Sequence, residues 1–200
     1  MLELKYIFKY VRDLLANTTD VWTRLRNDDK LNEGKFDYLF QHYYLPMMGV
    51  GAICIFLLYG LGIVSHSAVL DDKDFDLEVG LKGMVLFVVA YISAVPLATL
   101  IIKETFDRLF EQETEKNKLE VFAGYCVSLV MLVELVCAFL PQLSFLTFAG
   151  LYVIYVVWVG AALYLEIENR RLWFFTVVAF LSIYCAPIAI KWLLTLLLRF

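Results

Sequence analysis

Five long apolar stretches constrain this chain more than any other feature of its sequence. Each covers about 19 to 24 residues, close to the ~20 that an α-helix needs to cross the hydrocarbon core of a bilayer. Hydrophobic residues make up 62% of the chain. The sequence therefore predicts an all-α polytopic membrane protein, a bundle of five transmembrane helices. The stretches cover residues 43–66, 83–102, 122–140, 143–165 and 173–194.

The distribution of basic residues predicts how the chain is oriented in the membrane. Thirteen of the 17 Lys and Arg residues lie in the N-terminal segment and in the second and fourth connections, and four lie on the opposite flanks. Short flanks that are rich in Lys and Arg stay in the cytoplasm. We expect an integral protein of the bacterial inner membrane with a cytoplasmic N-terminus and a periplasmic C-terminus. No signal peptide is recognised before the first stretch, which we expect to direct insertion itself.

The first 42 residues carry amphipathic patterns, and we expect two N-terminal helices ahead of a transmembrane domain over residues 43–200. Apolar residues recur at helical spacing between Leu4 and Leu15. Such a helix suits the plane of the membrane interface, but packing against the cytoplasmic ends of the spans would produce the same pattern. The stretch Asp20-Val-Trp22-Thr-Arg-Leu25 predicts a second, short helix. Pro46 is expected in the first turn of the first span, where its missing N–H costs nothing.

Small residues and prolines within the stretches suggest how the spans pack. Ala90, Ala94 and Ala98 repeat every fourth residue and form a smooth stripe for a neighbouring helix. That neighbour is either another helix of the chain or a second copy, which would make the protein a homo-oligomer. Pro96 and Pro187 lie inside the second and fifth stretches, and each is expected to kink its helix because it removes a backbone hydrogen bond.

The connections between the stretches carry the remaining polar sequence. Residues 103–121 combine apolar residues at helical spacing with charges of both signs. We expect the second span to continue into the cytoplasm as a helix and to turn near Asn117. Its charged surface is either a solvated face or a docking site for a protein partner. Pro141 and Gln142 alone separate the third and fourth stretches, which predicts a tight antiparallel hairpin.

Motifs that would carry catalysis or metal binding are absent from the sequence. It contains no HExxH, GxSxG, Walker loop or CxxC. The acidic stretch from Asp72 to Glu78 resembles the start of a calcium loop, but Leu77 stands where that loop requires Gly. We therefore expect no catalytic, cofactor-binding or metal-binding residue, and no nucleic-acid partner. The cysteines are expected to be buried free thiols, namely Cys54, Cys126, Cys137 and Cys185.

Glu134 is the one carboxylate deep inside an apolar stretch. It lies about twelve residues into the third stretch, which corresponds to a depth of roughly 18 Å at 1.5 Å per residue. An intramembrane carboxylate is costly and by default marks a function or a specific partner. Lys191, in the fifth stretch, is the only cation inside a stretch that could pair with it. We expect either a structural Glu134–Lys191 pair, a protonated Glu134 bonded to a neighbour, or a proton or ion relay.

Short motifs along the whole chain resemble those of the Yip family of small five-span membrane proteins, the Ypt/Rab-interacting proteins, and particularly its bacterial branch. The helix bearing Trp22 and the aromatic approach ending in Leu45-Pro46 match the family pattern. Phe122-Ala-Gly124-Tyr125 resembles its Gly-Tyr motif, and Leu140-Pro141 resembles the proline that often closes the third span. Asn17-Thr18-Thr19 replaces a common proline, and the acidic Gly-Pro motif and long N-terminal region of the eukaryotic members are missing.

The resemblance implies different roles for the two branches of the family. It implies Rab-type GTPase binding and vesicle traffic for eukaryotic members, whose motif is absent here, and no firm activity for bacterial members. We expect a non-enzymatic membrane scaffold or adaptor that contacts the lipid bilayer and a protein partner at the cytoplasmic face. The alternative is a small transporter or ion-conducting protein that uses Glu134 and the kinked second and fifth spans. An intramembrane enzyme has no supporting motif.

Overall fold

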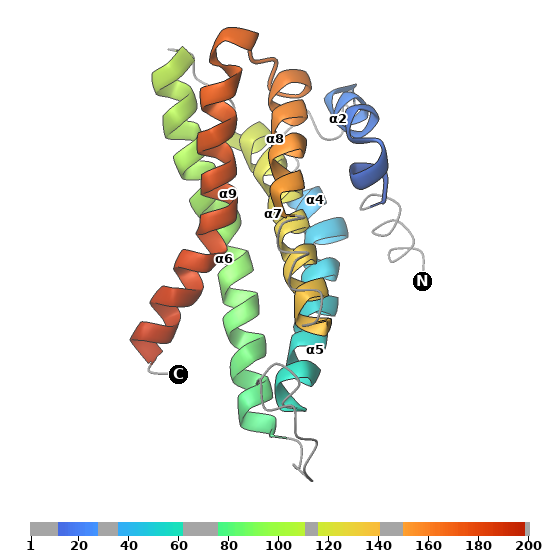
Figure 1. Cartoon of the computed structure of the whole chain (residues 1–200), viewed down its shortest axis with the longest axis vertical. Helices are drawn as coiled ribbons and strands as arrows, with labels where there is room; N and C mark the ends of the chain where they lie inside the picture. The colour runs from blue at the N-terminus through green and yellow to red at the C-terminus, as the bar shows by residue number, and fades with distance from the viewer. Residues whose placement is uncertain (1–11, 28–35, 62–75, 111–115, 141–149, 199–200) are drawn as a thin grey trace.

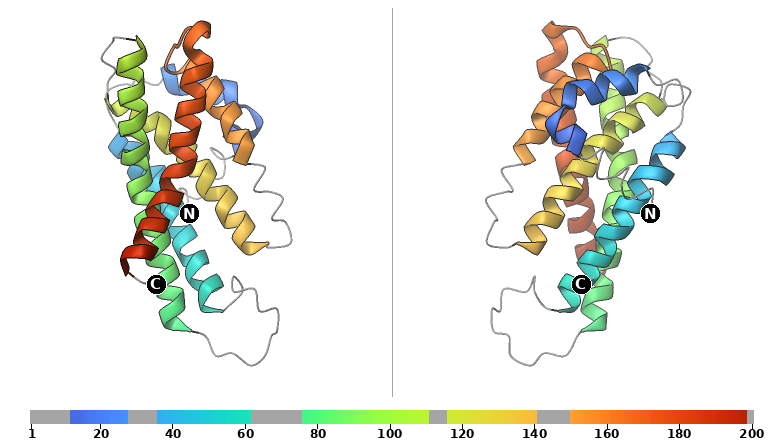
Figure 2. Two further views of the ribbon diagram at one scale, coloured as in Figure 1. Left: turned by 60° about the vertical axis from the view of Figure 1, so that its left-hand side comes forward. Right: turned by 90° about the vertical axis from the view of Figure 1, so that its right-hand side faces the viewer.

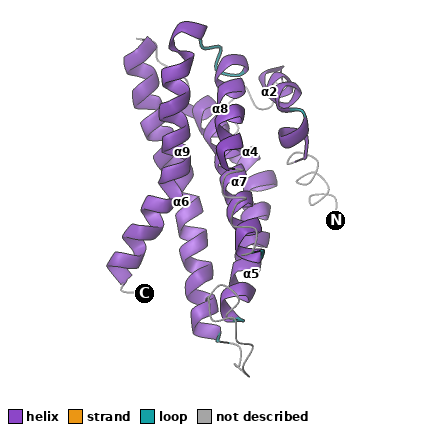
Figure 3. Cartoon of the chain, viewed as in Figure 1, coloured by secondary structure: helices purple, strands orange, loops and turns teal. Residues whose placement is uncertain are grey.

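The computed structural model describes residues 12–27, 36–61, 76–110, 116–140 and 150–198. Within these residues every regular element is a helix (Figure 3), which confirms the predicted all-α class. Residues 12–16 are helical, and residues 150–151 form a short 3₁₀ turn. The labelled elements are α2 (Thr18–Asn27), α4 (Phe36–Leu39), the π-helical turn η1 (Phe40–Tyr44), α5 (Leu45–Gly60), α6 (Leu77–Phe110), α7 (Lys116–Phe139), α8 (Tyr152–Leu163) and α9 (Asn169–Leu198).

Four of the described helices are long and apolar enough to cross a membrane. They are Phe36–Gly60, Leu77–Phe110, Lys116–Phe139 and Arg170–Leu197. Helix α8 is also apolar but has 12 residues, or about 18 Å of helix against a hydrocarbon core of about 30 Å. The predicted fourth stretch began at residue 143, and residues 143–149 lie outside the described part. A membrane protein is thus established, and the fifth span stays a prediction.

The first span begins at Phe36, seven residues before the expected start at residue 43. It runs without a break from Phe36 through α4, η1 and α5 to Gly60. Pro46 has no N–H to offer to the carbonyl of His42, and the turn before it widens: the N–H of Leu45 bonds to the carbonyl of Phe40. Pro46 lies in the first turn of α5, but the prediction that it opens the span is wrong.

Helix α6 is central and packs against α5, α7 and α9 (Figures 1 and 2). The alanine stripe lies on its covered side, because Ala90, Ala94 and Ala98 are all 0% exposed. The close-packed neighbour therefore belongs to the same chain, and the suggestion of a second copy at this stripe is wrong. Pro96 is accommodated inside α6, which stays helical from Leu77 to Phe110.

Helices α5 and α6 approach each other closely at the end of the bundle where α5 ends and α6 begins. A Cβ atom on Gly80 would lie 2.8 Å from the carbonyl oxygen of Phe56, so this contact requires glycine. Asp76 caps α6 by accepting bonds from the N–H groups of Glu78 and Val79 at 3.0 and 3.1 Å. Its own N–H bonds to the carbonyl of Gly60 at 2.9 Å, which joins the two helix ends.

Helix α9 contains Pro187, and Figure 1 shows its C-terminal part turning away from the axis of α6. This change of direction agrees with the kink expected at Pro187. The predicted turn near Asn117 is not tested, because residues 111–115 lie outside the described part and α7 begins at Lys116. The expected hairpin at Pro141 and Gln142 lies outside the described residues.

Candidate functional site: an intramembrane ion pair and the polar core around it

Three helices bring polar side chains together in the bundle. Glu134 comes from α7, Lys191 from α9 and Tyr91 from α6. The Nζ atom of Lys191 contacts both carboxylate oxygens of Glu134, and the hydroxyl of Tyr91 donates to Glu134 Oε2 at 2.7 Å. The Glu134 side chain keeps 37% and the Lys191 side chain 22% of its surface exposed. The structure therefore places the two predicted residues in one ion pair, close to the bundle surface.

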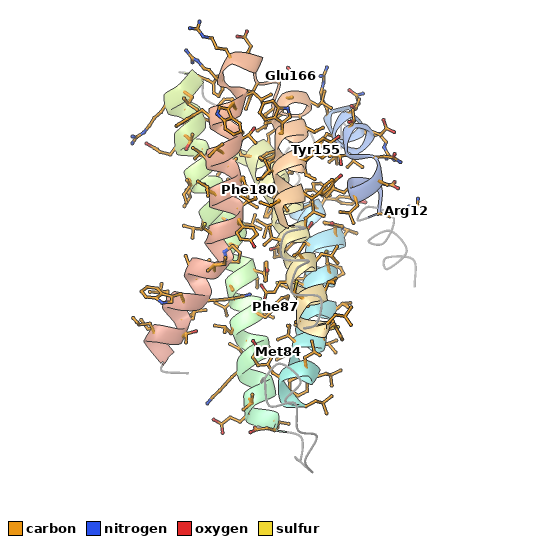
Figure 4. All side chains as sticks on the ribbon, viewed as in Figure 1. Arg12, Met84, Phe87, Tyr155, Glu166 and Phe180 are labelled. Atoms are coloured by element: carbon orange, nitrogen blue, oxygen red, sulfur yellow. The ribbon has the colours of Figure 1, made fainter. Side chains whose placement is uncertain are left out.

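Aromatic rings complete the surroundings of the Lys191 ammonium group. Its Nζ atom lies 5.0 Å from the ring centroid of Tyr91 and 5.8 Å from that of Phe87, which is labelled in Figure 4. Both rings are within the range of a cation–π contact. A charge that is unpaired inside a membrane is costly, whereas a pair with additional hydrogen bonds is tolerated. The tyrosine hydroxyl and the two rings thus stabilise a site that is neutral as a whole.

Further hydrogen bonds extend this polar core along the bundle. The Tyr44 hydroxyl donates to the carbonyl of Tyr91 at 2.9 Å. The Tyr43 hydroxyl lies 2.9 Å from Ser128 Oγ, which donates to the carbonyl of Tyr125 at 2.7 Å. Because the single Ser128 proton is used in that bond, Tyr43 is the donor to Ser128. Both tyrosines belong to the π turn η1 and are buried, so the widened turn directs two consecutive side chains into the core.

The helix α2 is held on the bundle by an aromatic cluster around Trp22. The Trp22 side chain is fully buried, and its ring lies 5.4 Å from Phe122, 5.5 Å from Tyr164 and 6.1 Å from Tyr125. Gly160 of α8 makes room for it, because a Cβ atom there would lie 2.7 Å from the Trp22 ring. Figure 2 shows α2 lying across α7 and α8 near one end of the bundle.

Hydrogen bonds at the start of α2 add to the aromatic contacts of Trp22. The Thr18 hydroxyl donates to the carbonyl of Leu14 at 2.7 Å, so the proton of the Tyr152 hydroxyl serves both the carbonyl of Leu15, at 2.8 Å, and Thr18 Oγ1, at 2.9 Å. The carbonyls of Leu14 and Leu15 lie at the end of the helical residues 12–16, where the helix itself supplies no N–H donor to them. The two hydroxyl groups supply the missing donors. Tyr152 thereby ties the N-terminal segment to the start of α8.

Asp13 links the two arginines of the N-terminal segment. Its carboxylate lies 3.1 Å from Arg12 Nη2 and 3.5 Å from Arg24 Nη2. The hydrogen bond from Arg12 holds the pKa of the Asp13 carboxyl below its ordinary value, with Arg24 acting in the same direction and partial burial against it. Of the two placements left open by the sequence, the structure shows packing on the bundle for residues 12–27, and residues 1–11 lie outside the description.

The family motif residues fall mostly into one place. Trp22 and Tyr125 are in ring contact, and a Cβ atom on Gly124 would lie 3.2 Å from Leu39 of α4. Pro141 lies outside the described residues. The roles of Gly160 and Tyr91 were not predicted from the sequence. A hydroxyl in an apolar stretch, as at Tyr91, was a usable signal, although Ser93 and Thr99 of the same stretch carry it too. The role of Gly160 depends on which helix faces it.

The side chains gathered at this site are a carboxylate, an ammonium group and a phenol hydroxyl. Across the described ranges, no group of three or more His, Cys, Asp or Glu residues could hold a metal ion. The four cysteines are free thiols: Cys126 is buried, Cys54 and Cys137 are half-buried, and Cys185 is exposed. The expectation that all four are buried is therefore wrong, most clearly for Cys185. The Glu134–Lys191–Tyr91 group brings interacting ionisable side chains together from three of the described helices.

Comparison with known proteins assigns the chain to a family. The Yip1 domain family matches residues 13–190, which include the Trp22 helix, the Gly124-Tyr125 pair and Glu134, and the match ends one residue before Lys191. Neither the curated proteins nor the solved structures gave a match to the chain. The family match covers well over half of the chain, from the N-terminal helices to the last membrane span. The chain belongs to the Yip1 domain family of membrane proteins.

Proposed function

We propose that this protein is a non-enzymatic scaffold or adaptor of the bacterial inner membrane, with its N-terminus in the cytoplasm and its C-terminus in the periplasm. The observation that carries the proposal is the docked helix α2. One face of α2 is buried on the bundle through Thr18, Val21, Trp22 and Leu25. The opposite face is polar and exposed, which leaves a charged surface held in a fixed position at the membrane.

A fixed surface suits recognition of a protein partner. Residues such as Asp20, Thr23 and Arg24 are exposed on α2, and their backbone is already ordered by Trp22 and Tyr152. A partner that binds there does not have to order the helix first, which lowers the entropic cost of binding. Rab-type GTPase binding is not part of the proposal, because the eukaryotic acidic Gly-Pro motif is absent from the sequence.

In-membrane photocrosslinking tests the adaptor proposal. A photoreactive amino acid at Thr23 of the full chain, expressed in its native membrane, should capture a reproducible protein partner. The matched control is the same group at Glu78, which is exposed at the opposite end of the bundle. Equal capture at the two positions, or capture of nothing at Thr23 under conditions where the group is shown to react, would contradict the proposal.

A small transporter or ion-conducting protein is the second candidate, and the exposed ion pair favours it. Lys191 lies on α9, which contains Pro187, and Glu134 lies on α7, which contacts α9. Neither side chain is fully enclosed. A proton could move between the carboxylate and a neighbour if α9 moved about Pro187. Proton and cation flux in vesicles containing the purified protein tests this candidate. Flux that disappears in Glu134→Gln would support transport, and vesicles as tight as protein-free ones would exclude it for the ions tested.

A further inference from the structure

An apolar cavity lies between the N-terminal segment, α7 and α8. Its volume is about 360 Å³, within the range of ~300–1,000 Å³ that is typical of small-molecule sites. Leu129, Leu132, Val133 and Val136 form one wall as a single stripe of α7, spaced as neighbours on one face of a helix. The other walls come from Leu15 before α2 and from Tyr152 and Val153 of α8.

The lining of the cavity selects an occupant without polar atoms. Six of the seven lining residues are aliphatic, and the seventh is Tyr152. The Tyr152 hydroxyl is bonded to the carbonyl of Leu15 and to Thr18, so it has no proton left for a ligand. An extended polypeptide would bring unpaired N–H and C=O groups into this cavity, which is costly in an apolar environment. A hydrocarbon chain has no such groups.

Positive charge lies next to the same cavity. Leu15 shares its short helix with Arg12, whose side chain is 75% exposed, and Arg24 is 59% exposed. Figure 4 shows Arg12 on the outer side of this helix, away from the bundle. Both arginines contact Asp13, so the group carries one net positive charge. A negatively charged headgroup would meet these arginines while its acyl chain enters the cavity.

We propose that the cavity between α7, α8 and the N-terminal segment binds an acyl chain of an anionic membrane phospholipid whose headgroup contacts Arg12 and Arg24. The bilayer supplies this ligand directly at the depth of α7. The site is distinct from the Glu134–Lys191 pair, and it does not depend on whether α2 recruits a protein. Its consequence is that anionic lipid stabilises the docked position of the N-terminal segment, because Leu15 lines the site and Arg12 would bind the headgroup.

Photolabelling in nanodiscs tests this site with the purified full chain. The probe is phosphatidylglycerol with a diazirine near the end of one acyl chain, diluted into phosphatidylcholine. We expect saturable labelling of peptides that contain residues 129–136 or 152–153, above the labelling of the exposed α9 residues Leu181 and Ile188. Filling the cavity with Val133→Trp should reduce the specific labelling to the α9 level. A Trp substitution on the lipid-facing surface, Leu181→Trp, should leave it unchanged.

A surface variant separates loss of the site from loss of the fold. Arg12→Gln changes a side chain that is 75% exposed and leaves Asp13 in contact with Arg24, so the cavity should remain. The preference for phosphatidylglycerol over the matched phosphatidylcholine probe should fall roughly fivefold. Uniform labelling of all lipid-facing peptides would overturn the proposal. So would a photoreactive group at Leu132 that captures a second copy of the chain, or a part of the same chain other than the cavity walls at Leu15 and residues 152–153, since either would be the true occupant of the cavity.

Discussion

At the scale of single residues, Glu134 is stabilised by partners of two kinds. Lys191 supplies the opposite charge, and the Tyr91 hydroxyl adds a hydrogen bond at 2.7 Å. Removing one member of such a pair leaves an uncompensated charge, whereas replacing both by neutral groups removes the desolvation problem. The pairing of Glu134 with Lys191 can therefore be tested by comparing single and double substitutions.

We expect Glu134→Gln to lower the stability by roughly 1–3 kcal/mol, less than the ~3–5 kcal/mol of a fully buried pair because both side chains are partly exposed. Glu134→Gln combined with Lys191→Met should recover much of this loss. Thermal unfolding of the purified protein in detergent measures both effects. The matched control is Glu104→Gln, which removes a carboxylate that is 65% exposed and paired with Arg108, and it should change the stability by no more than about 0.5 kcal/mol. A double variant as unstable as the single one would contradict pairing.

At the scale of elements, the docking of α2 depends on a close fit between a large ring and a glycine. Trp22 and Phe122 are both fully buried, and they occupy the space over Gly160. No small movement of a flexible side chain end can make room there, because both neighbours are rigid rings. The position of the N-terminal segment is thus determined by a residue of α8, more than 130 positions away in the sequence.

Gly160→Ala should therefore displace α2 from the bundle. The added methyl group would lie 2.7 Å from the Trp22 ring, and overpacking of this kind typically costs about 1–3 kcal/mol. The thiol of Val21→Cys, at a position that is 2% exposed, should become reactive toward a water-soluble maleimide in the Gly160→Ala background. Gly49→Ala is the matched control, since no atom lies within 4 Å of its added methyl group. Equal reactivity in the two backgrounds would show that Gly160 does not control docking.

The Asp13 carboxylate gives the same docking a dependence on pH. Because Arg12 and Arg24 lower the pKa of Asp13 in the folded protein, the carboxylate stabilises docking above its unfolded pKa of about 3.9, and this contribution is lost as the pH falls through the lower folded pKa. Proteolysis at the N-terminal segment should therefore become faster as the pH falls below about 4, when an acid-tolerant protease is used. Asp13→Asn should show weaker docking at neutral pH and no further change over this range. A wild-type profile that stays flat would contradict this role.

At the scale of the whole molecule, the orientation of the bundle is still a prediction from the basic residues. It places the joined ends of α6 and α7 in the cytoplasm and the joined ends of α5 and α6 in the periplasm. Cysteine at Glu104 should be labelled from the cytoplasmic side, and cysteine at Glu78 from the periplasmic side, by a reagent that does not cross membranes. Both side chains are well exposed, at 65% and 76%. Labelling of the Glu78 position from the cytoplasm would reverse the orientation.

The sequence by itself determined the class of the protein and much of its secondary structure. Long apolar stretches can only be helices in a membrane, since every backbone polar group must be satisfied within the segment. The same logic singled out Glu134 and Lys191, because charges are rare at that depth. The helix around Trp22 followed from local capping and spacing. These conclusions depend on interactions between residues that are near one another in the chain or on the solvent that surrounds it.

Tertiary structure alone decided which surfaces meet. Whether the alanine stripe faces α5, α7, α9 or a second copy depends on how the helices are arranged, and periodicity is the same in each case. The π turn before Pro46 accommodates the missing N–H of Pro46 and directs Tyr43 and Tyr44 to partners in the core, and the helix continues back to Phe36. Gly160 and Tyr91 gained their roles from neighbours on other helices. Local sequence specifies each helix, but the energy of packing and of hydrogen bonds between helices selects their faces, and that energy exists only in the assembled bundle.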